Sequence, residues 1–359
     1  MSLMPIKKRI GIPRALSYYN NFPFYFGFFN FLGIDVIVSD KTTSDIINKG
    51  SKLVVSETCF PVKVYVGHLV NLLEKGVDVI FVPAIQSISH KINNCSKIRG
   101  LPEIIRNVIN APFLMVEPTL DKTENIGFYD FLRESVAPFG ITDEKQIKAA
   151  SKAGWKMYNN FHNMTKQGVP YQRALDCAIK GENIQTGSEL GNSLSVVIMA
   201  HGYNLFDERI SMRLINKLEK MDIKVFTSLQ VTDEEAKTAI NNLGEVQYWA
   251  NEYELIGTAG HFLIKGSVDG IIALSAFGCG PDSLMIDEIS YHTKKAKMPL
   301  LHLTIDEHTG EAGFMTRIDA FVDMLYRKKR QSLKENIDKI EMKESSVDFY
   351  EKKNLVHKN

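Results

Sequence analysis

Residues 53–83 read LVVSETCFPVKVYVGHLVNLLEKGVDVIFVP, and this stretch decides the fold class. The short apolar run Leu53–Val55 and the longer run Val77–Val82 each predict a strand, and Val62–Leu73 between them has helical spacing. A strand, a helix and a second strand in this order predict a right-handed crossover and a parallel sheet. Cys59 follows the first of these strands, so it is expected at the carboxyl edge of the sheet, where open α/β sheets bind ligands.

The same alternation continues on both sides of this stretch and predicts a flavodoxin-like or Rossmann-like lobe. One helix is expected over Ala15–Leu32, interrupted at Pro23, and another begins near Thr43, whose side chain can cap it, and closes at Gly50. The remaining helices expected in this lobe are Val62–Glu74 and Leu101–Ile109, and its strands are Arg9–Ile12, Asp35–Ser39, Leu53–Ser56, Val77–Pro83 and Phe113–Glu117.

Strand patterns disappear from about Thr119 to Asn192, where three helices are expected instead, and a second α/β series then begins at Leu194. The strands expected in that series are Ser195–Ala200, Lys224–Ser228, Val268–Leu274 and Leu300–Ile305. The sequence therefore predicts an α/β protein with two parallel-sheet lobes joined by a helical segment. The expected divisions are a first lobe at 4–118, the helical segment at 119–192, a second lobe at 193–328 and a charged tail at 329–359.

The composition excludes several classes of protein. The 359 residues are 44% hydrophobic and 24% charged with a net charge of +1, so no basic surface for nucleic acid is expected. No run reaches the roughly 18 apolar residues of a membrane span, and the N-terminus lacks the pattern of a signal peptide, so a cytoplasmic location is expected. Neither a P-loop nor a Gly-x-Gly-x-x-Gly fingerprint occurs, so no nucleotide site is predicted.

The cysteines carry the strongest chemical signal. Cys95 follows the second strand of the opening stretch, and Cys279 follows a strand-like run in the second lobe, so both are expected at the same kind of sheet edge as Cys59. Three such thiols could hold zinc, hold an iron–sulfur cluster or act as nucleophiles. Zinc sites usually contain cysteines two to four residues apart, and none occurs here, which favours the cluster. Cys177 lies on a helical packing face and is assigned to the core.

Other polar groups are expected at the same edges. The backbone N–H groups of Gly278 and Gly280 could donate hydrogen bonds to sulfides and thiolates beside Cys279. His201 follows the first strand of the second lobe. Glu307 and Glu311, with His308 between them, follow its last strand, and these side chains are candidate proton donors, cluster neighbours or substrate contacts.

Five stretches of this sequence together resemble one protein group. These stretches are Ile10–Leu16, Glu57–Lys63 followed by Gly67 and His68, Cys95–Pro102, Phe277–Ser283 and Asp306–Gly313. They resemble the acyl-CoA dehydratase activase-related proteins, which belong with 2-hydroxyglutaryl-CoA dehydratase subunits and double-cubane cluster proteins in the wider group of 2-hydroxyacyl-CoA dehydratase components. The resemblance extends over nearly the whole chain.

The resemblance implies α/β lobes around a cleft and an oxygen-sensitive [4Fe-4S] or double-cubane cluster held by Cys59, Cys95 and Cys279. It also implies low-potential reduction by a separate ATP-hydrolysing activase. In dehydratase relatives the reduced cluster passes an electron to a 2-hydroxyacyl-CoA, and the resulting ketyl radical loses water, whereas double-cubane relatives reduce small molecules. A dehydratase subunit is implied as a further partner, and relatives pair, which suggests a homodimer.

This sequence lacks two features that the family hypothesis would lead us to expect, and two other interpretations remain open. The ATP-binding motifs of the activase itself are not recognisable, and no residues match an acyl-CoA pocket. The chain could instead be a non-catalytic α/β scaffold that docks to an activase or dehydratase partner, with or without a cluster. The same cysteines could also form a structural zinc site.

Overall fold

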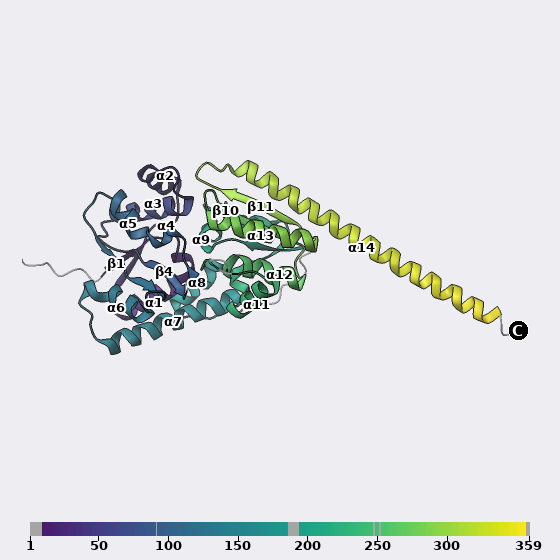
Figure 1. The fold of residues 1–359 in the computed structure, drawn as a ribbon, viewed down its shortest axis with the longest axis horizontal. Helices are drawn as coiled ribbons and strands as arrows, with labels where there is room; N and C mark the ends of the chain where they lie inside the picture. The colour runs from purple at the N-terminus through teal and green to yellow at the C-terminus, as the bar shows by residue number, and fades with distance from the viewer. Residues whose placement is uncertain (1–8, 91, 186–193, 247, 251–252, 357–359) are drawn as a thin grey trace, which may run out of the picture. The chain divides into compact units, whose positions relative to one another are not determined.

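The computed structural model describes residues 9–90, 92–185, 194–246, 248–250 and 253–356. One compact unit extends to Thr309, and a second begins at Gly310. The first unit contains two four-stranded parallel sheets flanked by helices, which confirms the predicted α/β fold with two lobes (Figure 1). We call each sheet with its helices a lobe.

The first lobe is organised around β1. Its strand order is β2-β1-β3-β6, and every pair is parallel. The chain moves outward from β1 to β2 and then returns to β3 on the other side of β1. The strands are β1 (Arg9–Ile12), β2 (Asp35–Val38), β3 (Val79–Phe81) and β6 (Leu114–Val116), and the helices are α1 (Tyr18–Phe31), α2 (Ser44–Leu53), α3 (Phe60–Glu74) and α5 (Leu101–Val108).

The strand order alone places the topological switch point between β1 and β3, where the chain changes its direction of travel across the sheet.

The first helix passes through Pro23 without interruption, contrary to the prediction. Proline lacks the N–H that would normally bond to the carbonyl oxygen four residues earlier, which belongs here to Tyr19. That oxygen instead accepts a hydrogen bond of 3.0 Å from the hydroxyl of Tyr171 in the helical segment. A tertiary contact therefore satisfies the backbone group that proline leaves without a partner.

The predicted strand Leu53–Ser56 is wrong, because its first residue is the last residue of helix α2 and a turn follows. The helix does begin after Thr43, whose Oγ1 accepts a hydrogen bond of 3.2 Å from the backbone N–H of Ile46, as predicted. It does not end at Gly50, which lies inside it. Cys59 is consequently preceded by a helix and a turn, and not by a strand.

Close contact between the backbones of α2 and α3 explains why glycine lies inside these helices. A Cβ at Gly50 would lie 1.9 Å from the carbonyl oxygen of Lys63, and a Cβ at Gly67 would lie 2.0 Å from that of Ile46. Both distances are far below any van der Waals contact. Gly50 therefore permits helix packing, and the sequence pattern was mistaken for a helix end.

A small third sheet that the sequence did not predict lies in the first lobe. Its strand order is β5-β4-β7, with strands β4 (Ala84–Ser89), β5 (Ile92–Asn93) and β7 (Thr119–Asp121). The strands β4 and β5 pair antiparallel, and the short helix α4 (Ser96–Arg99) follows them. Strands β4 and β5 lie between β3 and Cys95 in the chain, so Cys95 does not directly follow β3.

The helical segment contains three α-helices, as predicted. It consists of α6 (Phe128–Val136), the 3₁₀ turn η1 (Ala137–Phe139), α7 (Glu144–Lys166) and α8 (Tyr171–Lys180). Helix α7 packs closely on α1, since a Cβ at Gly154 would lie 2.8 Å from the carbonyl oxygen of Phe24. The predicted end of this segment near Asn192 lies outside the described residues.

The second lobe has the strand order β11-β10-β8-β9, again with parallel pairs only. Its strands are β8 (Leu194–Met199), β9 (Ile223–Phe226), β10 (Gly270–Ala276) and β11 (Leu300–Ile305). Its helical elements are α9 (Gly202–Leu205), α10 (Leu214–Lys220), η2 (Ser228–Gln230), α11 (Asp233–Leu243), the π-helix η3 (Tyr253–Gly257), α12 (Thr258–Lys265) and α13 (Gly280–Ala296). The switch point lies between β8 and β10, whose carboxyl ends lead to His201 and Cys279.

The second compact unit is formed by one long helix, α14 (Glu311–Val356). Among the described residues, no helix is both long and apolar enough to cross a membrane.

Candidate functional site

Each of the three candidate cysteines is the N-cap residue of a helix. Cys59 precedes α3, Cys95 precedes α4 and Cys279 precedes α13. All three have an extended backbone, and none of the three thiols makes a side-chain capping hydrogen bond. All three are half-buried. The start of a helix carries a partial positive charge, which favours a thiolate or a sulfide at this position.

The turn before Cys279 has the geometry that its sequence predicts. Gly278 has a φ of 76°, in the left-handed region that glycine adopts at low cost. Gly280 is the first residue of α13, and Pro281 follows in the first turn, where its missing N–H breaks no helical bond. The sequence CGP therefore turns the chain sharply from β10 into α13 and leaves the thiol at the junction.

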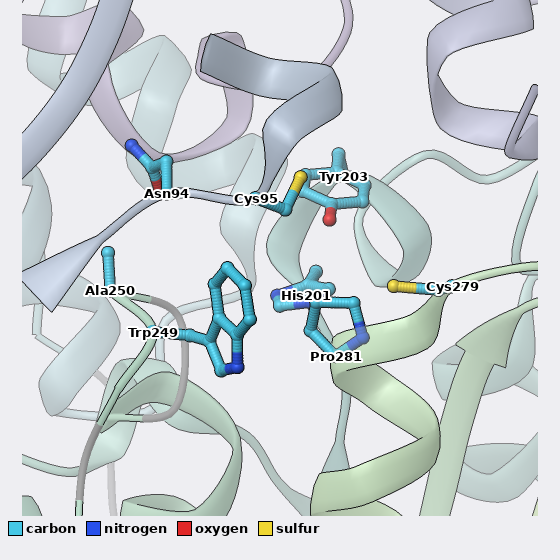
Figure 2. Close-up of a pocket in the computed structure, with 8 residues that line it drawn as sticks. All are labelled: Asn94, Cys95, His201, Tyr203, Trp249, Ala250, Cys279 and Pro281. Atoms are coloured by element: carbon cyan, nitrogen blue, oxygen red, sulfur yellow. The ribbon is translucent and has the colours of Figure 1, made fainter.

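Two of the thiols border one small pocket. Figure 2 shows Cys95 from the first lobe and Cys279 from the second around this pocket, together with His201, Tyr203 and Trp249. The space is about 270 Å³ including its open mouth, which is less than most small-molecule pockets enclose. This size suits a compact group better than an extended ligand.

Cys59 does not line this pocket, but it lies close enough to act electrostatically on the residues that do. Burial raises the pKa of the Tyr203 hydroxyl well above its usual range, and Asp282 and the three cysteines raise it further. Burial likewise raises the pKa of Cys59, with a smaller contribution from Cys95. All three candidate thiols therefore lie close enough to Tyr203 to influence its pKa.

The thiol of Cys279 lies beside a buried carboxylate. Its pKa is raised, first by burial and then by the negative charge of Asp282, which is only 2% exposed. A thiol in this setting stays protonated unless a positive group compensates its charge. Asp282 was not among the predicted site residues, although it lies three positions after Cys279 in the same motif.

His201, which follows β8, lines the same pocket as Cys95 and Cys279. Its Nε2 lies 2.7 Å from Oδ1 of Asp282, and its ring stacks on Tyr203 with centroids 4.9 Å apart. Burial acts to lower the pKa of His201, but Asp282 and Glu254 together raise it to about 10. The imidazole is therefore held as a cation between two carboxylates. Its Nδ1 faces Oε2 of Glu254 at 3.7 Å, which is an ion-pair distance but too long for a hydrogen bond.

Glu307 forms an ion pair with Lys63, which lies four residues after Cys59. The lysine Nζ is 2.5 Å from Oε1 of Glu307 and donates a second hydrogen bond of 3.0 Å to the carbonyl oxygen of Ser56. Burial acts to raise the pKa of Glu307. The hydrogen bond and charge of Lys63, a backbone hydrogen bond and the charge of His308 together outweigh burial, so the net shift of this pKa is downward. Glu307 is thus an ionised partner of a buried lysine.

The remaining residues named from the sequence, His308, Glu311 and Cys177, do not line the pocket. His308 is exposed, and its backbone N–H donates to Asp306. Glu311 begins α14 in the second compact unit. Cys177 is buried within the aromatic core of the first unit, in agreement with its assignment to packing.

No group of three or more His, Cys, Asp or Glu side chains among the described residues is placed to hold a metal ion. A single zinc ion would need thiolate sulfurs about 2.3 Å from one centre. An iron–sulfur cluster is several atoms across, so its ligands need not converge on one point. The three cysteines supply the donor type that such a cluster takes, which is thiolate sulfur.

A second buried polar network links the two lobes. His68 Nδ1 lies 2.9 Å from the Ser39 hydroxyl, and its Nε2 lies 2.9 Å from that of Thr42. Thr42 donates to Asp207 of the second lobe, which also accepts a hydrogen bond of 2.9 Å from Tyr19. The imidazole of His68 is fully buried within this network.

This burial predicts that His68 makes stability depend on pH. Burial, helped by the charge of Arg14, lowers the pKa of His68 from 6.5 to about 3. Below pH 6.5 the unfolded chain therefore gains a proton that the folded chain does not take up until about pH 3. His68 should cost about 2 kcal/mol of stability at pH 5 relative to pH 7.5.

Chemical denaturation at several pH values measures this effect. The variant His68→Gln should lose less stability between pH 7.5 and pH 5 than the unmodified chain. His90→Gln, which changes an exposed histidine, should keep the original dependence. An unchanged slope in His68→Gln would show that another group is responsible.

A comparison with known families identifies the kind of chain that carries this site. A family model described as "CoA enzyme activase uncharacterised domain" matches residues 9–231, which is more than half of the chain. The chain belongs to this family. No curated protein matches the chain. The part matched by the CoA enzyme activase domain contains Cys59, Cys95 and His201, whereas Cys279 and Glu307 lie beyond it.

Proposed function

We propose that this CoA enzyme activase-related protein holds an iron–sulfur cluster on Cys59, Cys95 and Cys279 and takes part in ATP-coupled, low-potential electron transfer. The observation that carries the proposal is that three half-buried thiols, from distant parts of the chain, each lie at the N-cap of a helix. When bound, such a cluster would supply one electron at low potential.

The electrostatics of the site support this ligand set. Three helix starts direct partial positive charge and backbone N–H groups toward the thiolates, and these stabilise a group that is negatively charged. Burial and the charge of Asp282 raise the pKa of Cys279 and so oppose its thiolate form; a cluster on this cysteine would have to supply the compensating positive charge. Cys177, which lies in the core, has no such setting.

Residues around the pocket would serve the reacting molecule. His201 is fixed by Asp282 and Tyr203 and could donate a proton to a group in the pocket. Trp249 and Tyr203 supply apolar surface that limits access of water. In this proposal the downstream reaction is the dehydration of a 2-hydroxyacyl-CoA or the reduction of a small molecule.

Electron delivery requires a donor close to the site, and the proposed donor is an ATP-hydrolysing activase. Large apolar side chains near the cysteines are exposed: Val55 at 66%, Phe277 at 69% and Leu284 at 67%. Each lies within five residues of Cys59 or Cys279. Exposed apolar side chains beside a functional site are typical of a docking surface.

The test is the iron and acid-labile sulfide content of protein purified without oxygen, together with its visible spectrum. The proposal expects about four irons and four sulfides per chain for one cubane, or about twice that for a double cubane, with absorbance that bleaches on reduction. No iron after anaerobic reconstitution would overturn it. Zinc in place of iron would support a structural site on the same cysteines.

A further inference from the structure

We propose that Lys63 and Glu307 form a positioning pair that sets where the Cys59 thiol lies relative to Cys279. The inference rests on the proposed function only for its consequence, which is retention of the cluster. The position of Cys59 relative to Cys279 is a property of the chain without any bound group.

One end of the pair is fixed to Cys59. Lys63 lies one helical turn after Cys59, and its backbone N–H donates to the Cys59 carbonyl oxygen at 3.3 Å. Its side chain folds back so that Nζ donates to Ser56, on the other side of the cysteine. Lys63 therefore holds the turn that carries Cys59 through two hydrogen bonds, one to Ser56 and one to Cys59 itself.

The other end of the pair is fixed to Cys279. Glu307 lies two residues after Ile305, the last residue of β11. Ile305 is paired with Ala276 of β10, and its carbonyl oxygen accepts a hydrogen bond of 2.9 Å from the backbone N–H of Phe277. Cys279 follows two residues later. Glu307 and Cys279 thus extend from the same pair of hydrogen-bonded strands.

Burial makes this connection stiff. The side chain of Lys63 is only 6% exposed and that of Glu307 is 18% exposed, so a lysine that lost its partner could not turn into water. An unpaired buried charge is strongly unfavourable, which forces the turn around Cys59 to move if the pair is broken. The lobes would stay joined elsewhere, because Asp207 binds Tyr19 and Thr42 of the first lobe.

The first readout needs no cluster. In the full-length, metal-free chain with Cys95→Ala and Cys177→Ala, only Cys59 and Cys279 can be cross-linked by a short bismaleimide. Adding Glu307→Gln should slow this cross-link at least about tenfold, because small displacements of reacting groups have large effects on rate. Glu74→Gln is the matched control, since it breaks the ion pair of 2.8 Å between Lys49 and the far end of the same helix.

The second readout is the loss of iron to a chelator from chains that retain all four cysteines. Glu307→Gln should lose iron about tenfold faster than the unmodified chain and the Glu74→Gln control. If the unmodified chain binds no iron but the cross-link still slows, the proposed function fails and the positioning role stands.

Folding is checked by circular dichroism at the assay temperature. If Glu307→Gln does not fold, Lys63→Met replaces it, because the remaining Glu307 can turn toward solvent. A folded variant of either kind that cross-links at the original rate would overturn the inference.

Discussion

Replacing Cys279 with alanine should abolish binding of the proposed cluster, reducing iron in anaerobically purified protein from about four atoms per chain to background. The thiol lies at the turn between β10 and α13, where Gly278 and Pro281 fix the backbone. No neighbouring cysteine can replace it, since the fourth cysteine is buried in the core of the first unit. The measurement is iron and sulfide content together with the visible spectrum.

The control for this result is Cys177→Ala, which removes a thiol that is 8% exposed and lies in the core. It should keep its iron even if the chain becomes slightly less stable. Cys59→Ala and Cys95→Ala should behave like the Cys279 variant. Equal iron in the Cys279 and Cys177 variants would contradict the ligand assignment.

Replacing Gly67 with alanine should destabilise the first lobe by about 3 kcal/mol or more, which would leave little of the folded state. The added Cβ would lie 2.0 Å from the carbonyl oxygen of Ile46. Backbone atoms cannot rotate away as a side chain would, so α2 and α3 must separate. Cys59 is the N-cap residue of α3, so displacement of this helix should also reduce retention of the proposed cluster. Thermal and chemical unfolding measure the loss of stability.

Gly313→Ala is the comparison for this variant. A Cβ at Gly313 meets no described atom within 4 Å, and alanine favours a helix over glycine by about 0.5–1 kcal/mol. Its stability should be unchanged or slightly higher. A Gly67→Ala chain as stable as this control would show that α2 and α3 can move apart at little cost.

The sequence predicts those parts of the fold that local patterns determine. The strands Arg9–Ile12 and Leu300–Ile305 are found with the predicted bounds, because each is an apolar run between clear breaks. The run Leu53–Val55 could not be assigned in this way, since three apolar residues fit the end of a helix as well as a strand. Gly50 looked like a helix end because its role depends on α3, which the local pattern does not include.

In the candidate site, too, features that depend on local sequence could be predicted and those that depend on distant contacts could not. The turn at Cys279 could be predicted, because Gly278 and Pro281 are adjacent to it in sequence and have defined backbone preferences. The partner of Lys63 could not, because Glu307 lies 244 residues away in the chain. The cation at His201 likewise depends on Asp282 and Glu254, which only the folded chain brings to it.

The distribution of the cysteines over two lobes has a consequence for biogenesis. Cys59 and Cys95 are synthesised early and belong to the first lobe, whereas Cys279 emerges from the ribosome only after most of the second lobe. A nascent chain that ends at residue 231, where the family match stops, carries just two of the three thiols. Insertion of the proposed cluster would therefore have to follow synthesis of Cys279, and a chain that ends before this residue would be released without it.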